Sequence, residues 1–298
     1  MTAVLIYGEP LADAIRRDIR SDVEALAKDG IVPSLVAVQI GADRSSELYV
    51  KRQARDCRAL GIKHRLDLLP ADTTESGALE HIKKLNVDPA VNGIILQMPL
   101  PQGFDALSLQ SAIDRRKDVE GIHPENLGRI VQGRIDLAPS TALAAFKLIR
   151  STGIDLYGKE VVVVGHSQIV GRPMALMLLE EFSTVTVCHI GTRDISDYTR
   201  RADLLVVAAG VPGLIRGDMI KPGAFVVDIG INRVIKRAAD GSAILDDKGE
   251  PVRETVGDVV FEDALKVAGY LTPVPGGVGP LTVTMLLKNI VSAATWMR

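Results

Sequence analysis

The stretch Glu160-Val-Val-Val-Val-Gly-His-Ser-Gln-Ile-Val-Gly-Arg-Pro173 decides the fold, because its periodicity changes at a single glycine. The four valines before Gly165 are typical of a strand that is buried on both faces of a parallel sheet. After Gly165 the apolar residues fall at helical spacing, and Pro173 is tolerated in the first turn of a helix. A strand, a glycine turn and a helix in this order point backbone N–H groups and the positive end of a helix dipole at one spot. The stretch is therefore a candidate site for a pyrophosphate.

The glycine pattern departs from the dinucleotide fingerprint G-x-G-x-x-G. Ser167 stands at the second glycine position, Val170 stands at the third, and Gly171 comes one place late. Taken alone, the stretch is as consistent with an ordinary strand-to-helix corner as with a nucleotide site. The flanking sequence has to decide between the two interpretations.

The composition favours a soluble two-domain protein whose partners are small molecules or a second copy of the chain. The chain has 298 residues, 47% of them apolar, which is ample for two packed cores. With a net charge of −2 and interleaved charges, no footprint for nucleic acid or a membrane surface stands out. Cys57 and Cys188 lack the spacing of a disulfide framework or a zinc site, and His123 has no second imidazole nearby, so we expect no metal. We expect a cytoplasmic protein, because no signal peptide and no apolar run of roughly 20 residues is present.

Strands and helices alternate on both sides of the valine strand. The first half predicts strands at 34–40, 63–69 and 93–97 and helices at 11–26, 45–60 and 74–85. The second half predicts strands at 184–188, 203–208 and 224–229 and helices at 195–201 and 281–296. The fold class is therefore α/β with two domains: an N-terminal βα sheet domain and a C-terminal Rossmann domain, a doubly wound parallel sheet, with a cleft between them. We place the domain boundary near Pro139, so that residues 140–279 form the dinucleotide domain.

Several polar residues are candidates for chemistry, each beside a structural alternative. Tyr49 and Gln53 are four apart on a predicted helix and share a face, although a tyrosine there is more often half-buried core. Gln97 ends a predicted strand, where it either serves the site or caps the strand. Asp118 and Glu120 point the same way if their segment is extended, and the alternative is a solvated acidic turn.

The second half of the chain adds Asp228 as a candidate, and the sequence argues against a hydrolase that uses a nucleophilic side chain. Asp228 ends a strand, where it either contacts a ribose or nicotinamide or caps a turn. No serine lies in a G-x-S-x-G elbow, and neither cysteine has a histidine partner in sequence, so a nucleophilic hydrolase is the weaker class. Hydride transfer is the natural interpretation.

Together these motifs resemble the FolD family, the bifunctional methylenetetrahydrofolate dehydrogenase/methenyltetrahydrofolate cyclohydrolase. The resemblance covers essentially the whole chain. The stretches that carry it are Tyr49-Val50, Gly93-Ile-Ile-Leu-Gln-Met-Pro-Leu-Pro101, Lys117-Asp-Val-Glu-Gly121, Gly165-His-Ser-Gln-Ile-Val-Gly-Arg-Pro173, Asp228-Ile-Gly-Ile-Asn-Arg233, Val256-Gly-Asp-Val259 and Thr272-Pro-Val-Pro-Gly-Gly-Val-Gly-Pro-Leu-Thr282.

The resemblance implies a cytoplasmic homodimer that binds a folate and NADP, with NAD as an open alternative. Residues 1–139, completed by the C-terminal helix 280–298, would form the folate-binding domain. Tyr49 would stack on the aminobenzoyl part of the folate, and Glu120 stands where the family's D-V-D-G loop has the aspartate that holds the pterin. The loop with Pro275, Gly276 and Gly277 would close over substrate and nicotinamide. The dinucleotide would contact Gly165, His166, Ser167, Ile190 and Ile231.

One departure bears on the chemistry. Four residues after the tyrosine the family has a lysine, paired with the glutamine of Gln-Leu-Pro-Leu-Pro, and this sequence has Gln53. Dehydrogenation needs mainly positioning, whereas hydrolysis needs proton transfer, which a neutral amide does not supply. We therefore expect a dehydrogenase with weak or absent cyclohydrolase activity. The alternatives are a fully bifunctional enzyme, with Lys51 or a water replacing the lysine, and a catalytically silent folate- or nucleotide-binding regulator.

A second departure concerns the dinucleotide. Ile190 follows His189 where many NADP-using members have a polar or basic residue, and His166, Arg172 and Arg193 are the other sources of positive charge.

Overall fold

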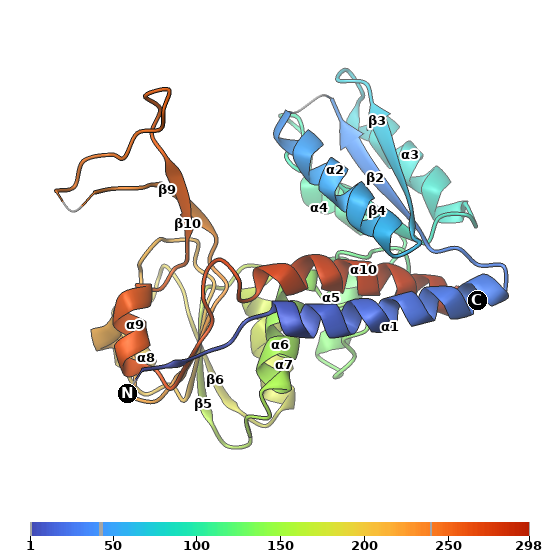
Figure 1. Cartoon of the computed structure of the whole chain (residues 1–298). Coiled ribbons are helices and arrows are strands. Elements are labelled where there is room, and N and C mark those ends of the chain that lie inside the picture. Colours follow the sequence, from blue (N-terminus) through green and yellow to red (C-terminus); the bar gives the residue numbers. More distant parts are fainter. Residues whose placement is uncertain (1, 42–43, 239, 298) are drawn as a thin grey trace. The chain divides into compact units, whose positions relative to one another are not determined.

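The computed structural model describes residues 2–41, 44–238 and 240–297, with the backbone alone for residues 44–49 (Figure 1). The chain divides into two compact units. Unit 1 comprises Met1–Leu11 and Ala144–Leu281, and unit 2 comprises Ala12–Leu143 and Thr282–Arg298. Each unit contains one parallel sheet.

Unit 1 is built on a six-stranded sheet in which every pair of neighbours is parallel. The strands, in spatial order, are β1 (Val4–Leu5), β11 (Tyr270–Leu271), β8 (Phe225–Asp228), β7 (Leu204–Val207), β5 (Glu160–Val164) and β6 (Thr184–Cys188). Because β5 lies between β6 and β7, the chain reverses its direction across the sheet at the end of β5. Ligands of open α/β sheets bind at such a switch point. The predicted Rossmann sheet is confirmed, while the two-residue strand β1 is too short to show a periodicity.

Helices and a projecting arm complete unit 1. The helices are α7 (Gly171–Glu180), α8 (Ser196–Thr199), the 3-10 helix η1 (Gly217–Met219), α9 (Phe261–Val267) and α6 (Ser140–Ser151), which begins in unit 2. The antiparallel pair β9 (Asn232–Ile235) and β10 (Arg253–Val256) leads into an arm that extends away from the sheet (Figure 1). Two further antiparallel bridges, between Arg237 and Ala243 and between Leu245 and Pro251, continue this arm.

Unit 2 has a three-stranded parallel sheet covered on both faces. Its strands, in spatial order, are β3 (Lys63–Leu69), β2 (Ser34–Ile40) and β4 (Gly93–Leu96). The central strand β2 is buried along its whole length. The helices of this unit are α1 (Glu9–Lys28), α2 (Arg44–Ala59), α3 (Glu75–Val87), α4 (Ala106–Ser111), α5 (Pro124–Ile130) and most of α10 (Gly279–Trp296).

The two cores of unit 2 explain why the end of the chain belongs to this unit. On one face of the sheet, Leu35 packs in a cluster with Ile19 of α1 and Ile290 of α10. On the other face, Val36 packs in a cluster with Ile82 of α3. Alternate residues of a strand point to opposite faces, so neighbouring positions of β2 serve different cores. Helix α10 thus covers one face of the sheet.

The spacing of apolar residues predicted the bounds of most helices and strands to within a few residues. The strands predicted at 34–40, 63–69 and 184–188 have those bounds in the structure. Helix α5, which was not predicted, begins at Pro124, and His123 Nδ1 caps it by accepting the N–H of Glu125 at 3.1 Å. In the described part of the chain, no helix is long and apolar enough to cross a membrane.

Candidate functional site

The turn after β5 explains the altered glycine pattern. Gly165 has a φ of +118°, and a Cβ atom there would lie 2.2 Å from the carbonyl oxygen of Ala208 on the neighbouring strand end. A Cβ atom on Gly171 would lie 2.0 Å from the carbonyl oxygen of Gly165. The late glycine therefore lets α7 pack directly on the turn, the role of the third glycine in the standard fingerprint. Ser167 accepts the N–H of Val170 at 3.2 Å and that of Gly171 at 3.5 Å, at the start of the helix.

A cavity of about 680 Å³ opens beside this turn at the carboxyl ends of β5, β6 and β7. Four of the five predicted dinucleotide contacts line it: Gly165, His166, Ser167 and Ile190. The rings of His166 and His189 lie with their centroids 5.0 Å apart, and the Ile190 side chain is fully exposed. Arg193 and Asp194 add one charge of each sign to the lining. Exposed backbone at a helix start and a cavity at the switch point suit a dinucleotide.

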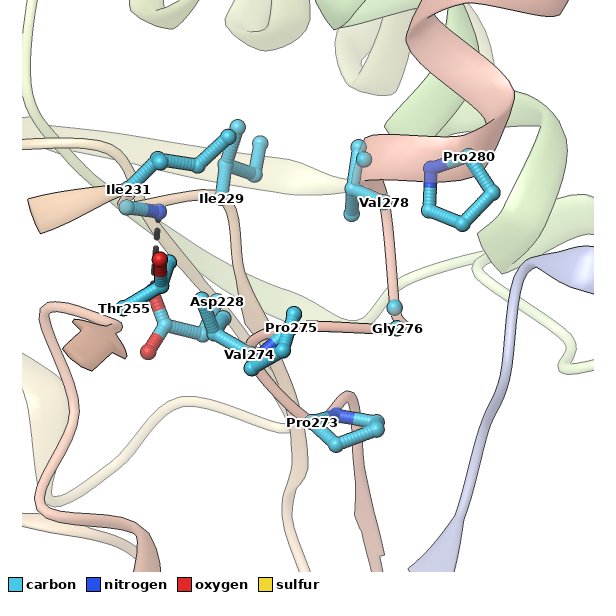
Figure 2. A pocket seen from close by; sticks show the side chains of 13 residues that line it. Asp228, Ile229, Ile231, Thr255, Pro273, Val274, Pro275, Gly276, Val278 and Pro280 are labelled. Atoms are coloured by element: carbon cyan, nitrogen blue, oxygen red, sulfur yellow. Dashed lines mark hydrogen bonds between the residues drawn. The ribbon is translucent and has the colours of Figure 1, made fainter.

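Ile231, the fifth predicted contact, lies in a different cavity of unit 1. Figure 2 shows Ile231 across from the loop that contains Pro275 and Gly276. The cavity has a volume of about 420 Å³ and is also lined by Gly277 and Asp228. The structure thus brings one predicted dinucleotide contact together with three predicted substrate contacts within one unit. Gly276 has a φ of +111°, which a glycine adopts without strain.

Two buried carboxylates tie the strand ends of unit 1 together. Asp228, 3% exposed, accepts three backbone N–H groups, from Gly230 at 2.9 Å, Asp258 at 3.0 Å and Val259 at 2.9 Å. Asp258, fully buried, accepts the N–H groups of Ala209 at 2.7 Å and Gly210 at 2.8 Å. Asp228 and Asp258 therefore hold the ends of β7 and β8 and the turn after β10 in one arrangement.

Burial dominates the titration of Asp228. Removal from water raises the pKa of this carboxyl to about 7, against the lowering effect of its three N–H donors. Its role is to position the backbone, so of the two interpretations made from the sequence, the structure shows the turn cap directly. The sequence had no signal for Asp258 as its partner, because the two residues meet only through the fold.

In unit 2, the acidic loop is buried and is not a solvated turn. Asp118 is 2% exposed and accepts the N–H of Gly121 at 3.1 Å, the N–H of His123 at 2.8 Å and the side-chain amide of Asn126 at 2.8 Å. Asp118 runs beside β4, in a parallel bridge with Ile94. Burial raises its pKa, as these hydrogen bonds only partly compensate.

Glu120 is a proton donor at neutral pH. Burial, followed by the charge of Asp118, raises the pKa of Glu120 to about 8. The carboxyl is therefore protonated at pH 7 and can donate a hydrogen bond to a ligand, which a carboxylate cannot do. A carboxyl whose environment shifts its pKa this far is a candidate for a binding or catalytic role.

Gln53 and Gln97 are both buried, each 5% exposed, and carry free hydrogen-bond donors. Gln53 Oε1 lies 3.0 Å from His64 Nε2, on the adjacent strand β3. Among the described residues, neither Gln53 Nε2 nor Gln97 Nε2 has a hydrogen-bond partner. Gln53 is thus held by a histidine that the sequence did not single out, and burial lowers the pKa of that imidazole. Unsatisfied buried donors are costly and mark a site where a ligand group or water is expected.

The remaining points concern Tyr49 and the question of a metal site. The backbone of Tyr49 lies in α2, but its side chain is outside the described residues. No cluster of three or more His, Cys, Asp or Glu side chains that could hold a metal is found in the residues the structure describes.

Comparison with known proteins settles the family. Models of the tetrahydrofolate dehydrogenase/cyclohydrolase match both parts of the chain, the catalytic domain at residues 6–120 and the NAD(P)-binding domain at residues 139–298. The chain belongs to this family. It is 44% identical over 294 residues to the bifunctional protein FolD of Dechloromonas aromatica, covering 99% of this chain and 98% of the relative.

Solved structures of the family agree in fold. The bifunctional FolD enzyme of Campylobacter jejuni matches with a TM-score of 0.88 and 41% identity over 98% of this chain and 99% of that one. The FolD of Trypanosoma brucei, solved with NADP and an inhibitor, matches with a TM-score of 0.88 and 37% identity over 99% of this chain and 98% of that one. The family is one of NAD(P)-dependent enzymes of tetrahydrofolate, and the cavity at the β5 turn lies in its NAD(P)-binding domain.

Proposed function

We propose that this protein is an NAD(P)-dependent 5,10-methylenetetrahydrofolate dehydrogenase whose cyclohydrolase activity is weak or absent. The observation that carries the proposal is the bond between Gln53 and His64, at the position where the family resemblance leads us to expect a lysine. The Trypanosoma relative binds NADP, which supports NADP as the dinucleotide here.

The dehydrogenase half rests on positioning. A bound dinucleotide would accept the hydride, and the residues of the chain hold its parts in place. Gly165 and Gly171 bring the start of α7 close to the pyrophosphate position, while His166 and Ile190 line the cavity beyond it. Pro275 to Gly277 and Ile231 line the second cavity of unit 1, which we assign to the reacting end of the dinucleotide.

The substrate contacts that we propose in unit 2 are Tyr49, Gln97 and Glu120. Gln97 offers a free amide donor, and protonated Glu120 offers a hydroxyl donor, so both match the carbonyl and ring-nitrogen acceptors of a pterin. Tyr49 supplies the aromatic face that the family uses for stacking.

Gln53 weakens the hydrolytic half because an amide does not exchange protons at physiological pH. Hydrolysis of the methenyl cation needs a group that takes a proton from water, and loss of a positioned acid–base group typically costs about 10²- to 10⁴-fold. The bond to His64 also orients the Gln53 amide towards β3, because Oε1 is held there at 3.0 Å.

A second candidate, a fully bifunctional enzyme, is favoured by one observation. His64 is half-buried with a lowered pKa, so its imidazole is neutral at pH 7; Nε2 donates to Gln53 Oε1, and Nδ1 is the nitrogen that can accept a proton. If a water reached this imidazole beside Gln53, His64 would replace the lysine as the base.

Two assays on the purified protein separate these candidates. Reduction of NADP and of NAD is followed with methylenetetrahydrofolate, and decay of methenyltetrahydrofolate is followed without dinucleotide. We expect reduction, with methenyl decay close to the buffer rate. Gln53→Lys should then accelerate the decay, with Lys83→Gln, an exposed lysine of α3, as the control.

The other outcomes are equally specific. Fast methenyl decay that is lost in His64→Ala would replace the proposal by the bifunctional enzyme. No reduction of either dinucleotide would indicate a silent folate- or nucleotide-binding regulator.

We also propose that the protein is a cytoplasmic homodimer, as the family resemblance implies. Light scattering after size-exclusion chromatography should give twice the chain mass of 32.0 kDa. A monomer at micromolar concentration would contradict this part of the proposal.

A further inference from the structure

A cavity of about 700 Å³ lies at the amino ends of the strands of unit 2. Gln97 follows the last residue of β4, so it marks the opposite, carboxyl edge of the same sheet. One lining residue, His64, holds Gln53 in the proposed function, which gives the rest of the cavity no role. Its lining comes from the beginnings of β2 and β3 and from the segments that precede β2 and β4: Gly30, Ile31, Val32, Ser34, Leu35, Val36, Lys63, His64, Arg65, Pro89, Ala90, Val91 and Asn92.

Strand register places three polar side chains in one row across this sheet. Ser34 pairs with Lys63, and the pairing of Leu35 with Gly93 puts Asn92 beside Ser34 on the other side. Residues side by side in a parallel sheet point to the same face. Hydrogen bonds confirm the placement, because Asn92 Oδ1 accepts the backbone N–H of Ser34 at 3.0 Å and its hydroxyl at 3.3 Å.

Asn92 presents an unused donor in this row. Its side chain is 7% exposed, and its oxygen is occupied by Ser34. Within the described parts of the chain, Asn92 Nδ2 has no hydrogen-bond partner, although the residue lines the cavity. The Asn92 Nδ2 atom is open to solvent at the cavity, so a ligand or a water there can accept its hydrogen bond.

The charges around the cavity are positive. Lys63 has no ion-pair partner among the described residues, whereas Arg65 is engaged by Asp67 at 2.7 and 3.0 Å. No acidic side chain is among the lining residues, and the nearby carboxylate of Asp88 accepts the N–H of Ala90 at 2.9 Å. The exposed ammonium group of Lys63 is therefore available to an anion, and Ser34 separates it in the row from the free amide donor of Asn92.

The remaining wall is apolar. Ile31, Val32, Val36, Pro89 and Val91 line the cavity with hydrocarbon surface. Ligand sites combine such surface with a few polar groups that fix orientation. A cation and an amide donor at one place suit a carboxylate, which accepts from both, and the hydrocarbon surface suits an apolar body.

We propose that this cavity binds a small organic carboxylate, with its anionic group on Lys63 and Asn92 and its apolar body on the Ile31 and Pro89 side. The site is separate from the proposed folate contacts at the carboxyl edge of the sheet. The site should bind inorganic anions weakly, because they lack an apolar body. It should bind neutral aromatic molecules weakly, because they lack a negative charge.

The test titrates the isotope-labelled full-length protein and follows its backbone and side-chain amide resonances. The probes are benzoate, inorganic phosphate and benzyl alcohol, which separate charge from apolar body. We expect saturable shifts of the Asn92 side-chain amide and the Lys63 backbone amide with benzoate, and much weaker effects with the other two. Lys63→Gln should weaken benzoate binding about five-fold, the upper range for an exposed ion pair.

Two further variants sharpen the result. Asn92→Asp keeps the acceptor for Ser34 but replaces the free amide donor by a carboxylate oxygen. The shift of the Lys63 backbone amide on addition of benzoate should therefore disappear, while the remaining resonances stay those of the folded protein. Lys83→Gln, on the exposed face of α3, should bind as the wild type does. The proposal is overturned if benzoate causes no saturable shift at this cavity, if Lys63→Gln binds unchanged, or if phosphate or benzyl alcohol binds as tightly as benzoate.

Discussion

Replacement of Gly171 by alanine should disable the dinucleotide turn through one methyl group. The new Cβ would lie 2.0 Å from the carbonyl oxygen of Gly165, 2.6 Å from its carbon and 2.9 Å from the His166 nitrogen, all of them backbone atoms. Backbone cannot swing aside as a flexible side chain can. Since real Cβ atoms do not approach other atoms within 3.0 Å, α7 and the turn after β5 must separate by at least about 1 Å.

This separation has two measurable costs. Overpacking of this kind destabilises a folded domain by about 1–3 kcal/mol. A misplacement of about 1 Å in a site that works by positioning costs on the order of 100-fold in rate. We therefore expect Gly171→Ala to lower the thermal midpoint of unfolding and to lower kcat/KM for the dinucleotide about 100-fold.

Gly128→Ala is the matched control. Gly128 lies in α5, and a Cβ atom there would meet nothing within 4 Å. Alanine in a helix is favoured over glycine by about 0.5–1 kcal/mol, so this variant should be as stable as the wild type or more so. The packing argument is refuted if Gly171→Ala matches the wild type in both thermal midpoint and kcat/KM.

Three further variants test other parts of the site. Burial raises the pKa of Glu120 from its usual 4.5 to about 8, so this carboxyl binds a proton on folding. Its contribution to the free energy of unfolding is full below pH 4.5 and is lost as the pH rises to about 8. Urea unfolding at several pH values should show that Glu120→Gln removes this part of the decline, and an identical pH dependence of the two proteins would contradict it. Ile190→Arg places a cation on the wall of the cavity at the β5 turn. It should raise the ratio of kcat/KM for NADP to kcat/KM for NAD about ten-fold, which corresponds to about 1.4 kcal/mol. An unchanged ratio would mean that the 2′-phosphate of NADP does not bind beside residue 190. The N–H groups of Ala209 and Gly210 share Asp258 Oδ2, while the Asn232 side-chain amide donates to Asp258 Oδ1 at 2.8 Å. Asp258→Asn replaces one of these oxygens by an NH2 group, so at least one donor loses its acceptor; urea unfolding should show a loss of about 1–3 kcal/mol, and a stability equal to the wild type would refute the role of Asp258.

Much of the fold could be predicted from local patterns. The valine run of β5 and the alternation of strands and helices depend on the spacing of apolar residues within a few turns, and the structure has parallel sheets at those places. Helix α5 was missed because its residues lie in a stretch that is polar and broken by glycine. Strand β1 was missed because two residues are too few to show an alternation of apolar and polar positions.

The candidate site was predictable as residue types but not as contacts. Gln53 could be named from its helical spacing to Tyr49, yet its bond to His64 joins α2 to β3 across a turn. Asp118 could be named from its motif, yet its burial comes from the N–H groups of the loop that folds around it. Polar residues at strand ends can be recognised in a sequence, but their hydrogen-bond partners depend on which loops lie side by side in the folded protein.

By itself, the sequence determined that a glycine turn ends a doubly buried strand and that Gln53 stands where the family's lysine is expected. Only the tertiary structure decided why Gly171 comes late, which carboxyls bind protons near neutral pH, and that Asn92 and Lys63 share one row. The reason is that periodicity and residue identity are properties of neighbours along the chain. Burial, close approach and pKa depend on atoms that lie far apart in the chain and are brought together only by folding.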